Sequence, residues 1–147
     1  MSGHILVPMD GSPLSRRALE VALTEHDAPV TVLHVIDPAA PGYSYPVDVD
    51  PDVEPRHGSE EWYERAEDLA DQLFDEAEAL AHDHGREIET ALVVGDPARV
   101  VVDYAIDEDV DHIVIGGHAR DENSYLLLGS VTEAVAFRAP VRVTIVR

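Results

Sequence analysis

The chain of 147 residues contains no cysteine and no lysine. Without cysteine there can be no disulfide framework and no thiol chemistry. Without lysine there can be no Schiff base and no lysine-dependent phosphoryl transfer. All ten basic residues are arginines, and 30 acidic residues bring the formal net charge to −20. A surface of this charge repels nucleic acids and anionic lipids, so we expect no nucleic-acid partner and no membrane partner.

Targeting signals are also missing from the sequence. The segment MSGHILVPMDGS has no basic region followed by a long apolar one, and no stretch reaches the roughly 20 apolar residues of a membrane span. We therefore expect a cytosolic protein. Dispersed acid without lysine is typical of proteins from salt-in halophiles, where the Debye length falls to about 3 Å at molar salt. A surface adapted to protein partners is the alternative interpretation.

Strand and helix patterns alternate along the chain. Strand signals cover residues 4–9, 30–36, 88–95, 112–117 and 141–146, and helix signals cover residues 13–25, 59–85, 96–105 and 129–137. This alternation predicts a single α/β domain over residues 1–147, with a doubly wound parallel sheet of five strands and helices on both faces. Ligands of such sheets bind at the carboxyl ends of the strands, near the switch point.

Two parts of this pattern carry specific expectations. The longest helix should direct Trp62, Leu69 and Leu73 into the core, because they recur at helical spacing. Residues 37–58 contain five prolines and should form one long loop without regular structure.

The glycines in HIVIGGHARDENSYLLLGSV, residues 112–131, suggest an anion site. Gly116 and Gly117 follow a strand and let backbone approach a ligand. Gly129 and Ser130 begin a helix, where we expect free N–H groups that suit a phosphate. The alternative is a tight turn with an ordinary helix cap and no ligand.

Four segments, in this order, resemble the universal stress protein family: MDGSPLSRRALEVAL, LHVID, VVGDPARVVVDYA and GGHARDENSYLLLGSVTEAV. The chain is similar to UspA-like members of a haloarchaeal type, over nearly its whole length. The resemblance implies an adenine-nucleotide α-hydrolase-like sheet of order 3-2-1-4-5 and a role in the stress response. It further implies a homodimer through the C-terminal strand 141–146, an unidentified protein partner and, in one subfamily, ATP bound with Mg²⁺ or Mn²⁺.

The nucleotide-binding members resemble the pattern G-x-x-G, nine residues, then G-[ST]. Gly116, Gly129 and Ser130 match its marker positions, whereas Ala119 stands in place of the second glycine. A methyl group there costs roughly 1 kcal/mol if the residue must be left-handed, and more if it displaces phosphate. Asp121 and Glu122 add negative charge to the same loop.

The resemblance implies further contacts to the nucleotide. It places Asp10 near adenine or ribose and gives adenine a backbone contact at Val35. Arg120 could reach a phosphate, or it could pair with a nearby acid. Asp10 could equally cap the first helix or start a turn with Gly11 and Ser12.

No catalytic motif is present, and neither a catalytic residue nor a metal site is predicted. We expect a protein that is not an enzyme and that hydrolyses ATP slowly at most. The leading hypothesis is a nucleotide-responsive homodimer, and the alternative is a dimeric interaction protein of the same fold that binds no ATP. A small enzyme acting on an adenylated compound is a third, weaker hypothesis.

Overall fold

The computed structural model describes residues 3–38, 59–117 and 129–147. Strands and helices alternate within these ranges, and each lies within two residues of its predicted position. The strands are β1 (Ile5–Pro8), β2 (Val30–Ile36), β3 (Ile88–Val94), β4 (His112–Gly116) and β5 (Arg142–Val146). The helices are α1 (Pro13–Glu25), α2 (Glu60–Asp83), α3 (Pro97–Asp107) and α4 (Ser130–Arg138). The predicted loop 37–58 lies outside the described residues beyond Pro38.

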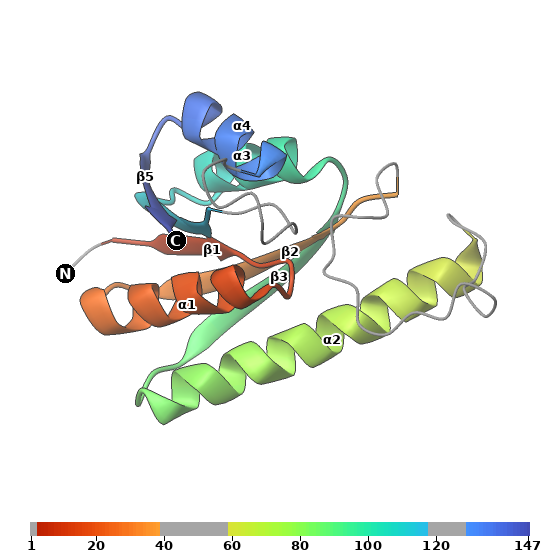
Figure 1. Cartoon of the computed structure of the whole chain (residues 1–147), viewed down its shortest axis with the longest axis horizontal. Coiled ribbons are helices and arrows are strands. Elements are labelled where there is room, and N and C mark those ends of the chain that lie inside the picture. The colour runs from red at the N-terminus through yellow and green to blue at the C-terminus, as the bar shows by residue number, and fades with distance from the viewer. Residues whose placement is uncertain (1–2, 39–58, 118–128) are drawn as a thin grey trace.

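The five strands form one parallel sheet of order β3-β2-β1-β4-β5. Helices α1 and α2 cover one face and α3 and α4 cover the other (Figure 1). Each face has its own buried apolar cluster, built from alternate residues of the same strands. The doubly wound α/β fold with this strand order is therefore confirmed.

The central strands are buried on both faces, as their continuous apolar runs predict. All seven residues of β2 are buried, and Ile113, Val114 and Ile115 of β4 are 0%, 0% and 5% exposed. Parallel strands between two helix layers need this pattern, because both of their faces meet apolar side chains. No helix in the described ranges is long and apolar enough to cross a membrane.

Helix α2 departs from the expected core. Its buried residues begin at Ala70 and include Leu73, whereas Trp62 and Leu69 are only half-buried. Figure 1 shows the cause: the first turns of α2 run on past the beginning of α1 and lie away from the strands. The prediction that Trp62 and Leu69 face the core is therefore wrong, although the helix itself is where the sequence places it.

Candidate functional site

The switch point of the sheet lies between β1 and β4. The chain leaves β1 through α1 on one face and leaves β4 toward α4 on the other. Strands β1 and β4 pair over only two residues, Ile5 with His112 and Leu6 with Ile113, whereas β1 and β2 pair over four. The two central strands therefore stop pairing before their carboxyl ends, where doubly wound sheets bind ligands.

Pro8 explains why this pairing stops. Ile5 and Met9 both donate their N–H groups toward β2, to Pro29 O and Leu33 O at 2.9 Å. Because backbone groups alternate in direction along a strand, an N–H at position 8 would point toward β4. Proline has no N–H, so β1 cannot extend its ladder on that side. The sequence contained this signal, but its meaning depends on knowing that β1 is central.

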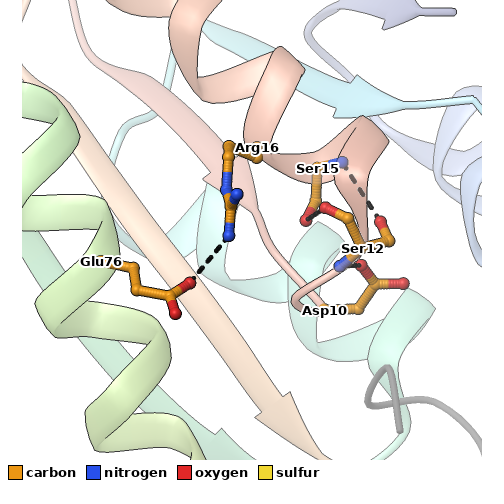
Figure 2. Close-up of polar contacts among 5 residues, drawn as sticks. All are labelled: Asp10, Ser12, Ser15, Arg16 and Glu76. Carbon is orange, nitrogen blue, oxygen red and sulfur yellow. Dashed lines mark hydrogen bonds and ion pairs between the residues drawn. The ribbon is translucent and has the colours of Figure 1, made fainter. Parts of the chain in front are cut away.

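Asp10 begins the turn between β1 and α1. Its Oδ1 accepts a hydrogen bond from the Ser12 N–H at 2.9 Å, and Gly11 between them adopts φ 86° (Figure 2). This left-handed conformation suits glycine, which has no Cβ. Of the roles considered for Asp10, the turn is confirmed and the helix cap belongs to Ser12. Its contact with adenine or ribose stays a prediction.

The first turn of α1 is capped by the chain itself. Ser12 Oγ accepts from the Ser15 N–H at 3.2 Å, and the Ser15 hydroxyl donates to Ser12 O at 2.8 Å (Figure 2). Ser15 is 4% exposed, whereas Ser12, which supplies the acceptor, is partly buried. The amides of Ser12 and Ser15 at the beginning of this helix are therefore both bonded within the turn, which holds the turn at Asp10 in place.

Gly116 and Gly117 allow the chain to pack closely on itself. A Cβ at Gly116 would lie 2.9 Å from Leu14 C and 3.0 Å from Ser15 N, in the backbone of α1. A Cβ at Gly117 would lie 2.8 Å from a methyl carbon of Ile145 in β5. Tight packing is thus the observed role of both glycines, and their contact with a ligand remains a prediction.

Gly129 does not offer the free N–H that the sequence suggests. Its N–H donates to Gly117 O at 3.2 Å, and Gly117 N–H donates to Val146 O at 2.7 Å. The expectation of a free Gly129 amide is therefore wrong. The reason is that residues 117 and 129 are brought together at the end of β4, so the amide of one meets the carbonyl of the other.

Within residues 3–38, 59–117 and 129–147, the remaining amides of the first turn of α4 have no hydrogen-bond acceptor. An α-helix leaves its first N–H groups without partners inside the helix, here those of Ser130, Val131 and Thr132. Gly129 supplies no side-chain cap, unlike Ser12, Ser59 and Asp96 at the other helices. Thr132 is 4% exposed, and its hydroxyl donates to Gly116 O at 2.7 Å, which anchors this turn at the carboxyl end of β4. Ser130 itself is exposed.

Val35 lies where β2 runs past the end of β1. Leu33 O accepts the Met9 N–H toward β1, and Ile36 O accepts the Gly95 N–H toward β3. By the same alternation, the N–H and C=O groups of Val35 face the β1 side, beyond the last residue of that strand. The backbone contact to adenine that the family resemblance implies for Val35 fits this position. The Val35 side chain is fully buried.

His34 is a residue of this site that the sequence analysis missed. It is 2% exposed, and its Nδ1 hydrogen-bonds the Met9 carbonyl at 2.7 Å, next to Asp10. Burial lowers the pKa of His34, while the Met9 carbonyl and the Asp10 carboxylate oppose that shift. A histidine inside an otherwise apolar strand, LHVI, was the available signal.

Two predicted contacts of the loop, Ala119 and Arg120, lie outside the described residues, as do Asp121 and Glu122. Within residues 3–38, 59–117 and 129–147, no group of three His, Cys, Asp or Glu side chains could hold a metal ion.

Comparisons with known proteins agree along the whole chain. Residues 1–147 match the Universal stress protein family. The universal stress protein in the QAH/OAS sulfhydrylase 3′ region of Thermus aquaticus is 33% identical over 147 residues, which cover 97% of each chain.

Solved structures give the same result. Universal stress protein UspA from Lactobacillus plantarum superposes with a TM-score of 0.76 at 26% identity, over 99% of this chain and 97% of that one. A universal stress protein in complex with cAMP superposes with a TM-score of 0.67 at 25% identity, over 99% and 96% of the two chains.

Proposed function

Because the chain belongs to the universal stress protein family, we propose that it binds ATP, with Mg²⁺ or Mn²⁺, at the carboxyl ends of β1 and β4. The first turn of α4, to which Gly129 supplies no side-chain cap, carries this proposal. Its three amides lie beside the end of β4, and the positive end of a helix dipole is a ready site for phosphate. With all basic residues being arginine, these backbone donors and Arg120 would hold the phosphates.

The adenine end of the nucleotide would lie against β2. The backbone of Val35 offers one donor and one acceptor on the side where β1 has ended, and Asp10 offers a carboxylate at the adjoining turn. The Val35 backbone could hydrogen-bond the adenine base, and the Asp10 carboxylate could accept hydrogen bonds from the ribose hydroxyls. The cAMP bound by a related protein supports the same class of ligand.

We also place the protein in the cytosol as a homodimer through β5, whose state responds to nucleotide. Strand β5 is an edge of the sheet, and Val143 and Ile145 on it are only partly buried. Pairing with a second copy would cover this edge. The expected mass in molar KCl, by light scattering, is twice the 16.1 kDa of one chain, and a monomeric mass would contradict the dimer.

The second candidate is a dimeric interaction protein that binds no nucleotide. The bond from Gly129 N–H to Gly117 O favours it, because that bond leaves one amide fewer for a phosphate at the start of α4. Ala119 favours it too, because the marker pattern has glycine there. In both cases the role is that of a non-enzymatic stress-response protein.

Calorimetric titration of Mg-ATP in molar KCl tests the proposal, with AMP as the comparison ligand. We expect a dissociation constant of roughly 1–100 µM for ATP and binding of AMP that is about tenfold weaker. Ala119→Gly should tighten ATP binding several-fold, roughly the effect of removing 1 kcal/mol of strain. Ala136→Gly, on the exposed side of α4, is the matched control and should leave affinity unchanged.

The outcomes separate the two candidates. Binding by wild type supports the nucleotide-responsive protein. Binding by Ala119→Gly alone means that the site is intact but disabled, which supports the ligand-free dimer. If neither protein binds ATP, the proposed site at β1 and β4 is wrong.

A further inference from the structure

The ring of His34 lies beneath the turn that carries Asp10. His34 belongs to β2 and lies on the α1 and α2 face of the sheet, where its ring meets Phe74 of α2 edge to face at 6.5 Å between centroids. Its Nδ1 is 2.7 Å from the carbonyl oxygen of Met9, the first residue after β1. A buried polar ring therefore links the core to the edge of the proposed nucleotide site.

We infer that His34 is a positioning residue, whose ring fixes the Met9 carbonyl and thereby sets the direction of Asp10 toward the nucleotide. This inference rests on the proposed function, because it names a residue that shapes the proposed site. It assigns no chemical step to His34, which is 2% exposed and lies behind the turn.

Both backbone polar groups of Met9 are held by β2, and this makes its orientation fixed. The Met9 N–H donates to Leu33 O at 2.9 Å, and the Met9 carbonyl accepts from His34 Nδ1 at 2.7 Å. The carbonyl oxygen of Met9 belongs to the peptide that joins Met9 to Asp10. With that peptide held, the Asp10 side chain starts from a fixed direction.

The contacts continue from Asp10 into α1. Asp10 Oδ1 accepts from the Ser12 N–H, and Ser12 Oγ caps the helix at Ser15 (Figure 2). If the Met9 carbonyl turned away from His34, Asp10 and the Ser12 amide would lose their present geometry. Packing alone does not achieve this, since an apolar side chain of the same size would leave the Met9 carbonyl without its donor.

The donor is present in the neutral ring. A carbonyl can only accept, so the hydrogen-bond proton is on Nδ1 of His34. Asparagine places an amide N–H at the same number of bonds from the backbone, whereas leucine offers no donor. This difference gives the test a conservative variant that should restore the role.

The test compares His34→Leu and His34→Asn with wild type, in two measurements. The first is the dissociation constant for Mg-ATP, which should rise about tenfold in His34→Leu and return to within about threefold of wild type in His34→Asn. The second is amide hydrogen exchange at Ser12, which should quicken about tenfold in His34→Leu and recover in His34→Asn.

His112→Leu is the matched control. His112 is also a buried strand histidine with a 2.7 Å hydrogen bond, from Nε2 to Thr144 Oγ1, but it begins β4 at the opposite end of the sheet. Its loss should lower stability and leave both ATP affinity and Ser12 exchange unchanged. If His112→Leu and His34→Leu weaken ATP binding equally, or if His34→Asn fails to restore it, the positioning role is refuted.

The two proposals fail separately. If wild type binds no ATP, the proposed function is wrong, and the Ser12 exchange rates still decide whether His34 fixes the turn. If wild type binds ATP and His34→Leu binds it equally well with Ser12 exchange unchanged, the nucleotide site stands and the role of His34 is wrong.

Discussion

Arg86 should be the arginine whose removal costs the most stability. It follows α2, and its guanidinium reaches across to the end of α1. Nη1 donates to Leu23 O at 2.8 Å and to His26 O at 2.6 Å, and Nη2 donates to Ala28 O at 2.6 Å. One side chain thus satisfies three carbonyls where α1 ends and the chain turns toward β2, and it places positive charge at the negative end of the helix dipole.

The size of the effect follows from these contacts. A hydrogen bond from a charged donor contributes about 1.5–3 kcal/mol, but the three share one partly exposed group and are not additive. We expect Arg86→Ala to lower the free energy of unfolding by about 2–4 kcal/mol, a large part of the roughly 5–15 kcal/mol of a typical domain. In a domain of this size that lowers Tm by about 4–16 °C.

Urea denaturation followed by circular dichroism measures this loss. Arg17→Ala is the control, because Arg17 is exposed on α1 and its side chain makes no hydrogen bond or ion pair in the described part of the chain. We expect a change within about 0.5 kcal/mol. Arg86→Lys should recover less than half of the loss, since one ammonium cannot reproduce the planar fork.

The salt dependence of stability distinguishes the hydrogen bonds of Arg86 from an ordinary ion pair. The acceptors of Arg86 are uncharged and partly buried, so its contribution should persist in 2 M KCl. The exposed pair between Arg16 and Glu76, at 2.9 Å (Figure 2), should contribute less than about 1 kcal/mol and lose most of it in the same buffer. An Arg86→Ala loss below about 0.5 kcal/mol, or one that vanishes in KCl, would refute the reasoning.

Three further predictions concern pH, one hydrogen bond and salt. Burial lowers the pKa of His34 and of His112, the latter helped by His26 and Arg142, so the unfolded chain binds protons first as pH falls through 6.5. The free energy of unfolding should therefore decrease as pH falls below about 6.5, until the lowered folded-state pKa values are reached. Urea denaturation at pH 7.5 and pH 5.5 measures it, and a higher free energy of unfolding at pH 5.5 would contradict this. Thr132→Val should cost about 1 kcal/mol and weaken ATP binding through the lost bond to the end of β4; unchanged calorimetry would count against it. Raising KCl from 0.1 to 2 M should raise Tm, because salt screens the net charge of −20, and a Tm that falls would exclude this effect.

The sequence was sufficient for the strands and helices because their signals are local, whereas the strand order followed from the family resemblance. Continuous apolar strands, Ser59 and Asp96 at helix starts and Gly85 after α2 each specify an element without knowledge of its neighbours. The exception is α2, where helical spacing correctly predicted a helix but not that Trp62 lies beyond the core. Burial depends on where the sheet ends, and no local pattern contains that information.

The site was less predictable because its contacts join segments that are far apart in the chain. The bond from Gly129 to Gly117 and the bond from His34 to Met9 both depend on tertiary placement. Pro8 could be read in the sequence, but its effect on pairing exists only if β1 has a neighbour on each side. Local motifs therefore predicted where a site would lie, and the structure was needed to show which donors and acceptors the described residues offer there.

The short ladder between β1 and β4 has a mechanical consequence. Strands β3, β2 and β1 form one half-sheet with long ladders, β4 and β5 form another, and two residue pairs join the halves. Helix α1, packed against Gly116, is the main further tie. A ligand that contacts Val35 on one half and the start of α4 on the other would link the two half-sheets where β1 and β4 no longer pair. Occupancy of the site would then change how firmly the two halves are held together, which a partner bound across both could detect.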